Sequence, residues 1–161
     1  MNPSSIRVLV VDDFKPWHHL IATMLWKQPE LRIIEDVSDG LTAVQRAQEL
    51  QPDLILLDIG LPTISGLEVA RRIRQCSPQS KILFISENLS PGIAEEALST
   101  GAGGYLVKSD AANELLPAIK AVLEGKRFIS SRLASHFLVA TTLSTQTVHL
   151  SWMLTLILGI Q

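Results

Sequence analysis

The order of short apolar runs and longer amphipathic stretches is the sequence feature that most restricts how this chain can fold. Runs rich in branched apolar residues occur at positions 6–11, 31–37, 54–57, 82–85 and 104–107. Helical patterns follow them, the first up to about position 28 and the others at 41–50, 65–75, 92–99 and 111–124. Nearly continuous apolar strands that alternate with helices are typical of a parallel sheet buried on both faces. The sequence therefore predicts an α/β fold with helices on both faces of a five-stranded sheet.

The connections of such a sheet limit its strand order. Crossovers between parallel strands are right-handed, and the common five-stranded doubly wound arrangement is the flavodoxin-like order 2-1-3-4-5. Ligands of these sheets bind beyond the carboxyl ends of the strands, where the strand order reverses. The residues directly after each predicted strand are therefore the first candidates for a functional site.

Charged and hydroxyl residues stand at four of these strand ends. Asp12 and Asp13 follow the first strand, Asp58 the third, Ser86 the fourth and Lys108 the fifth. Taken alone, Asp13 is more readily explained as a helix cap, and the others as ordinary loop residues. In the predicted sheet these four strands are neighbours, so their ends converge on one place.

Three carboxylates at one place repel one another and require a cation. Carboxylate oxygens with open water positions suit Mg²⁺, which often also binds a phosphate oxygen. A lysine and a hydroxyl beside the metal can hold the other oxygens of a phosphoryl group. The pattern favours phosphoryl transfer to a carboxylate, with Asp58 as the acceptor.

Several motifs with this spacing resemble the receiver domain of two-component response regulators. They are Val10-Val11-Asp12-Asp13, Leu57-Asp58-Ile59-Gly60-Leu61-Pro62, Gly66-Leu67, Ile85-Ser86 and Gly101-Ala102-Gly103-Gly104-Tyr105-Leu106-Val107-Lys108. The resemblance covers about residues 5–127 and implies a receiver domain over residues 1–127. Such a domain accepts a phosphoryl group in a phosphorelay and is not a conventional enzyme.

The resemblance also implies a donor and a metal. Asp58 would be phosphorylated by a sensor histidine kinase or a phosphotransfer protein. Mg²⁺ would be bound by Asp13 directly, by Asp12 mainly through a water molecule, and by Asp58 and the Gly60 carbonyl.

The same resemblance implies a switch that acts after phosphorylation. Lys108 would contact the phosphoryl group, Ser86 would move toward it, and the ring of Tyr105 would enter the space that Ser86 leaves. These movements would remodel a protein-interaction face. An aspartate-nucleophile phosphatase of the haloacid-dehalogenase kind ranks far lower, because it needs a second aspartate where this chain has Gly60.

The remaining residues, 128–161, are predicted to form a linker and an uncharged apolar tail. Ser109-Asp110 and the segment 124–130 resemble the receivers that carry a helix-turn-helix output domain, but only 29 residues follow Arg132, none of them Asp, Glu, Lys or Arg. Alternating apolar positions from 148 to 158 favour a strand, with a helix left open. The apolar run of 13 residues from 148 to 160 is too short for a membrane span.

Charge and cysteine content bear on partners and location. The chain has 14 basic and 16 acidic residues, a net charge of -2, and one cysteine. This charge balance and the uncharged tail argue against DNA binding by this chain. A lone cysteine indicates a reducing, cytoplasmic compartment. Two interpretations stay open: a signalling module that acts through protein contacts, including a possible homodimer, or a transcription regulator whose helix-turn-helix domain is truncated or missing from this chain.

Overall fold

In the computed structural model, which describes residues 4–137, six strands form one sheet. They are β1 (Ile6–Val11), β2 (Leu31–Val37), β3 (Leu54–Leu57), β4 (Lys81–Ser86), β5 (Gly104–Val107) and β6 (Phe128–Ile129). The strand order is β2-β1-β3-β4-β5-β6, and every neighbouring pair is parallel. The prediction of a doubly wound parallel sheet with order 2-1-3-4-5 is confirmed, with a sixth strand added beside β5.

The sixth strand was not predicted, because two residues are too few to show an alternating pattern. Its pairing with β5 is nevertheless specific. The Phe128 main-chain nitrogen donates to the Gly103 oxygen, and that of Ser130 donates to the Tyr105 oxygen, both at 3.0 Å. The buried Ser130 Oγ accepts a hydrogen bond of 2.7 Å from the Val107 nitrogen. The sheet therefore extends to residue 129, two residues beyond the resemblance.

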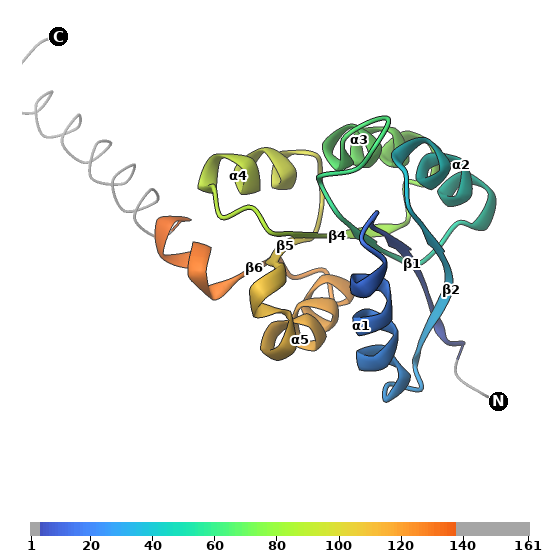
Figure 1. Ribbon diagram of the computed structural model, residues 1–161, viewed down its shortest axis with the longest axis horizontal. Coiled ribbons are helices and arrows are strands. Elements are labelled where there is room, and N and C mark those ends of the chain that lie inside the picture. The colour runs from blue at the N-terminus through green and yellow to red at the C-terminus, as the bar shows by residue number, and fades with distance from the viewer. Residues whose placement is uncertain (1–3, 138–161) are drawn as a thin grey trace, which may run out of the picture. The chain divides into compact units, whose positions relative to one another are not determined.

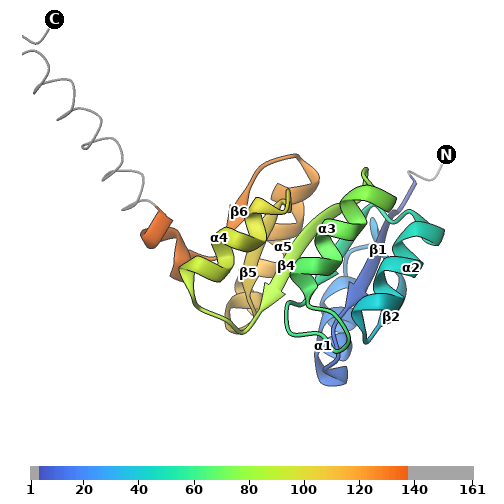
Figure 2. The same ribbon diagram turned by 90° about the horizontal axis from the view of Figure 1, so that it is seen from above.

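Five helices connect the strands, and they divide between the two faces of the sheet. They are α1 (Lys15–Trp26), α2 (Gly40–Leu50), α3 (Gly66–Cys76), α4 (Pro91–Ser99) and α5 (Ala111–Leu123). Helices α1 and α5 cover one face, and α2, α3 and α4 cover the other (Figures 1 and 2). Each helix ends within two residues of the predicted position, and α2 to α5 also begin within one residue of it.

The core between the sheet and α1 and α5 follows from the alternation of side chains along each strand. Val8 and Val10 of β1 enter this core, whereas Leu9 lies between them on the strand and faces the other layer. Both layers are apolar, so all four central strands are almost completely buried. The core residues contributed by the two helices are Trp17, Ile21, Leu25, Ala111, Leu115, Ala118, Ile119 and Val122.

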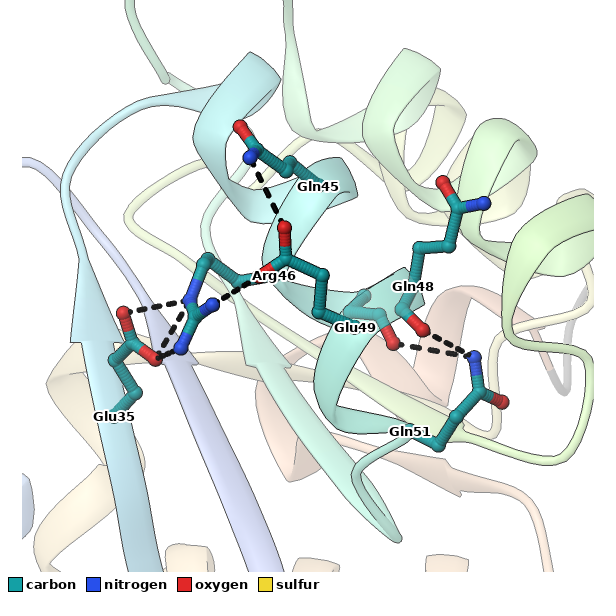
Figure 3. Close-up of polar contacts among 7 residues, drawn as sticks. Glu35, Gln45, Arg46, Gln48, Glu49 and Gln51 are labelled. Carbon is teal, nitrogen blue, oxygen red and sulfur yellow. Dashed lines mark hydrogen bonds and ion pairs between the residues drawn. The ribbon is translucent and has the colours of Figure 1, made fainter.

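The outer strand β2 is fastened to α2 by a polar network (Figure 3). The Arg46 guanidinium donates to both carboxylate oxygens of Glu35, through Nε at 2.8 and 2.9 Å and through Nη2 at 2.6 Å. Arg46 also pairs with Glu49, whose other oxygen accepts from Gln45 at 3.1 Å. A bidentate arginine of this kind fixes geometry more than a single ion pair does.

The chain divides into two units, residues 1–130 and 131–161. Of the second unit the structure describes residues 131–137, which are helical. The predicted strand or helix at 148–158 lies outside the described residues. Within residues 4–137 no helix has the length and apolarity needed to cross a bilayer.

Candidate functional site

An open cleft with a volume of about 690 Å³ lies where β1, β3, β4 and β5 end. Its walls bring together most of the residues that the strand-end argument selected. Loop residues beside the strand ends complete the walls. The full lining is Asp13, Phe14, Asp58, Ile59, Gly60, Ser86, Glu87, Asn88 and Lys108. The convergence predicted from the strand order is therefore present in the structure.

Asp58 is fixed at the floor of this cleft by its own main chain. Its nitrogen donates to the Val11 oxygen at 2.9 Å, which continues the ladder between β3 and β1. Its Oδ1 accepts from the Ile59 nitrogen at 2.8 Å. Only 8% of the residue is exposed. The second oxygen, Oδ2, faces Lys108.

Lys108 supplies the positive charge of the site. It opens a short 3₁₀ turn, Lys108–Asp110, directly after β5. Its Nζ lies 2.5 Å from Asp12 Oδ2 and 3.5 Å from Asp58 Oδ2. Both of these carboxylates are buried, so the ion pairs are poorly screened by solvent.

The three carboxylates form a cluster that a cation can occupy. Ligand atoms of Asp12, Asp13 and Asp58 all lie within 4.8 Å of one another. Asp12 is buried and its Oδ1 accepts from the Phe14 nitrogen at 2.8 Å, whereas Asp13 is exposed. Burial raises the pKa of Asp58 and the Asp12 charge adds to the rise, while Lys108 opposes it. A donor set of hard carboxylate oxygens at the mouth of a cleft fits Mg²⁺.

Ser86 and Tyr105 meet at one residue of the loop after β4. The Ser86 Oγ accepts from the Asn88 nitrogen at 3.1 Å, and the Tyr105 hydroxyl donates to the Asn88 oxygen at 2.8 Å. The Tyr105 residue has no exposed surface, and burial raises the pKa of its hydroxyl. The Tyr105 ring therefore lies inside the molecule in this structure, and the coupled movement of Ser86 and Tyr105 stays a prediction.

Two residues of the first turn of α1 adjoin the site, although the sequence argument gave them no role in it. The His18 Nε2 is hydrogen-bonded to the main-chain oxygen of Asp12, and its Nδ1 lies 3.2 Å from Asp36 Oδ1. The Trp17 ring lies beneath Lys108, with 5.2 Å between the Lys108 Nζ and the ring centroid. The spacing of adjacent histidines, which do not share a helix face, gave no indication that His18 contacts Asp12.

Gly66, the first residue of α3, packs on the backbone of Asp58. A Cβ at position 66 would lie 2.0 Å from the main-chain oxygen of Asp58 and 2.8 Å from the Ile59 Cα. Both are main-chain atoms, which cannot move away as a flexible side chain could. We expect Gly66→Ala to lower the free energy of unfolding by about 3 kcal/mol, the upper range for overpacking. Urea denaturation measures this loss.

Gly60→Ala is the matched control for that substitution. The atom nearest to a Cβ at position 60 is the Asp58 Oδ2, at an ordinary contact distance of 3.9 Å, and Gly60 is exposed. Its effect on stability should stay within about 0.5 kcal/mol. Equal stability of the two alanine variants would contradict the close packing at Gly66.

A doubly wound sheet with an acidic cleft and a lysine at its carboxyl edge defines the class of phosphoacceptor signalling domains. Residues 8–120 match the family described as the response regulator receiver domain. The chain belongs to this family.

Relatives and solved structures agree with the match. The chain is 30% identical over 138 residues to the transcriptional regulatory protein DegU of Brevibacillus brevis, covering 86% of this chain and 58% of that one. It is 38% identical over 128 residues to the transcriptional activator protein ExaE of Pseudomonas putida, covering 80% and 60%. A LuxR-family two-component response regulator from Aurantimonas sp. SI85-9A1 superposes with a TM-score of 0.81 at 29% identity, covering 86% and 99%. The chain thus spans about three-fifths of the curated relatives it matches.

Proposed function

We propose that the chain acts in a two-component phosphorelay by accepting a phosphoryl group on Asp58 from a sensor histidine kinase or a phosphotransfer protein. The observation that carries the proposal is the cluster of Asp12, Asp13 and Asp58, with ligand atoms within 4.8 Å, beside the Lys108 ammonium. The lone Cys76 supports a reducing, cytoplasmic location for this activity.

The reaction is a displacement at phosphorus. A carboxylate oxygen of Asp58 forms the new P–O bond while the P–N bond to the donor histidine breaks, and the histidine nitrogen keeps the electron pair. Asp58 must be ionised to attack, and Lys108 favours the ionised form against the effect of burial. Lys108 then neutralises negative charge on the transferred group. The domain promotes its own phosphorylation and dephosphorylation without being a conventional enzyme.

Mg²⁺ would be held by the carboxylate cluster and the Gly60 carbonyl. When bound, it neutralises the phosphoryl oxygens during transfer. Asp13 suits direct ligation because its carboxylate is exposed. The oxygens of Asp12 are already engaged by Lys108 and by the Phe14 nitrogen, so we assign Asp12 a ligand role through a water molecule.

The output of phosphorylation is assigned to the face formed by α4, β5 and α5. Ser86 at the end of β4 would turn toward the phosphoryl group. This movement would break the hydrogen bond that the Asn88 nitrogen now donates to the Ser86 hydroxyl. Because Tyr105 of β5 donates to the same loop residue, a movement of Asn88 changes the hydrogen bond of Tyr105 as well. This face would carry the signal to a partner protein or to a second copy of the chain, and DNA is not its target.

Amide hydrogen exchange on the full chain, with Mg²⁺ and with or without beryllofluoride as a phosphoryl mimic, tests this function. We expect changed protection in the loop after β4, in α4 and in β5 when beryllofluoride binds. Changes confined to residues 133–161 would move the output to the tail. No change at any segment would contradict the phosphoacceptor role itself.

A transcription regulator with a DNA-binding domain beyond this chain is the second candidate. The observation in its favour is that DegU and ExaE are named transcriptional proteins and that the chain spans 58% and 60% of their lengths. The genomic sequence that follows residue 161 discriminates the two candidates. A reading frame encoding a helix-turn-helix domain there would favour the second.

A further inference from the structure

The indole of Trp17 is the one aromatic ring found against a cation within residues 4–137. Trp17 lies in the first turn of α1 and is 7% exposed, and it belongs to the core beneath the sheet. Its ring centroid is 5.2 Å from the Lys108 Nζ, within the range in which an ammonium is attracted to the face of a ring. Lys108 thus has an aromatic neighbour in addition to its two carboxylates.

These neighbours respond differently to the reaction. Asp12 and Asp58 hold the ammonium in the resting site, at 2.5 and 3.5 Å. A bound divalent cation and the new P–O bond would both draw on the Asp58 carboxylate, so the contact of Lys108 with Asp58 would weaken just when Lys108 has to face the phosphoryl group. The Trp17 ring has no oxygen that a divalent cation could bind, so its attraction for the ammonium does not depend on whether the carboxylates change partners. Trp17 can therefore hold Lys108 in the cleft through the exchange of partners.

We propose that Trp17 is a positioning residue for Lys108, which it keeps directed at the phosphoryl site by a cation–π contact. The inference rests on the proposed function of Lys108. Packing alone does not require an indole here, because the next core positions of α1 are filled by the aliphatic residues Ile21 and Leu25. A positioning role predicts that the aromatic face matters beyond the volume it fills.

The first test compares Trp17→Phe with Trp17→Leu in the full chain. Both leave a smaller side chain in the core, but only phenylalanine keeps a ring face. With Mg²⁺ and acetyl phosphate we expect the phosphorylation rate of Trp17→Leu to fall about tenfold and that of Trp17→Phe less than about threefold. Mg²⁺ affinity, measured by calorimetry, should be the same in both. Equal rates in the two variants, or rates that follow their stabilities alone, would overturn the proposal.

A second test needs no phosphorylation and does not remove Trp17. In a chain carrying Trp26→Phe and Trp152→Phe, all tryptophan emission comes from Trp17. Adding Lys108→Met should shift this emission, because the charge over the ring is lost, whereas adding Lys126→Met should not. Identical emission in the Lys108 and Lys126 variants would refute the contact. Failure of the parent chain to accept a phosphoryl group would instead refute the proposed function. The emission measurement would then still show whether Trp17 contacts Lys108.

Discussion

Asp58→Asn is expected to abolish phosphorylation by acetyl phosphate. The parent chain should gain one acid-stable, base-labile phosphoryl group in the presence of Mg²⁺, because Asp58 is the carboxylate at the cleft floor that faces Lys108. Asparagine is nearly the same size but lacks the nucleophilic oxygen. Intact-mass measurement under acidic conditions detects the adduct. A normal yield of adduct on the variant would disprove the assignment of Asp58.

The same substitution should stabilise the metal-free protein at neutral pH. The pKa of Asp58 is held above its ordinary value of 3.8, chiefly by burial, so the folded state binds the proton more tightly than the unfolded chain does. Stability therefore falls as the pH rises from about 3.8 through the folded-state pKa. Asp58→Asn removes this contribution, and the two stability curves should separate above pH 3.8 and converge below it. Denaturant titrations at several pH values, with a chelator present, measure the separation.

Lys108→Met should cause the largest loss of stability among the charge substitutions at the site. The variant leaves the buried carboxylates of Asp12 and Asp58 close together without the ammonium that now lies 2.5 and 3.5 Å from them. Removing one partner of a buried ion pair typically costs about 3 kcal/mol or more. We expect a loss of this size in metal-free buffer at pH 7. Adding Mg²⁺ should recover part of the loss, because a divalent cation replaces the missing charge.

Lys126→Met provides the control for this prediction. Lys126 pairs with Glu124 at 3.0 Å, but its side chain is 73% exposed. Exposed pairs of this kind contribute about 0.5 kcal/mol or less. If the two methionine variants lose the same stability, or if Mg²⁺ restores neither, the buried ion pairs of Lys108 do not stabilise the fold more than an exposed pair does.

The sheet and the position of the site could be predicted because both depend on local patterns. Val8 to Val11 and Leu54 to Leu57 are uninterrupted apolar runs, and such runs occur in buried strands or in buried helix segments. Their short length favours strands. Once the strands were parallel, Asp12, Asp58 and Lys108 had to lie at one edge of the sheet. The roles assigned to these residues stay predictions.

What escaped prediction depends on contacts between elements that sequence patterns do not encode. The face of α1 that approaches the cleft is set by how the helix packs on β1 and α5, so the neighbours of Trp17 and His18 could not be deduced from spacing. The close approach of Gly66 to Asp58 was equally hidden, although the Gly66-Leu67 motif was part of the resemblance. A search for aromatic and histidine residues within one turn of a strand-end aspartate would have flagged both α1 residues.

The short pairing of β6 with β5 places Ser130 where it forms hydrogen bonds to the backbone of β5. Its main-chain nitrogen donates a hydrogen bond to the Tyr105 oxygen, and its hydroxyl accepts one from the Val107 nitrogen. Ser130 is thus hydrogen-bonded to β5 on both sides of Leu106, and the second bond lies one residue before Lys108. A displacement of β5 along its axis must therefore pull on the backbone at Ser130 or break these two hydrogen bonds. Ser130 is therefore the point at which a displacement of β5 reaches the backbone that follows the sheet.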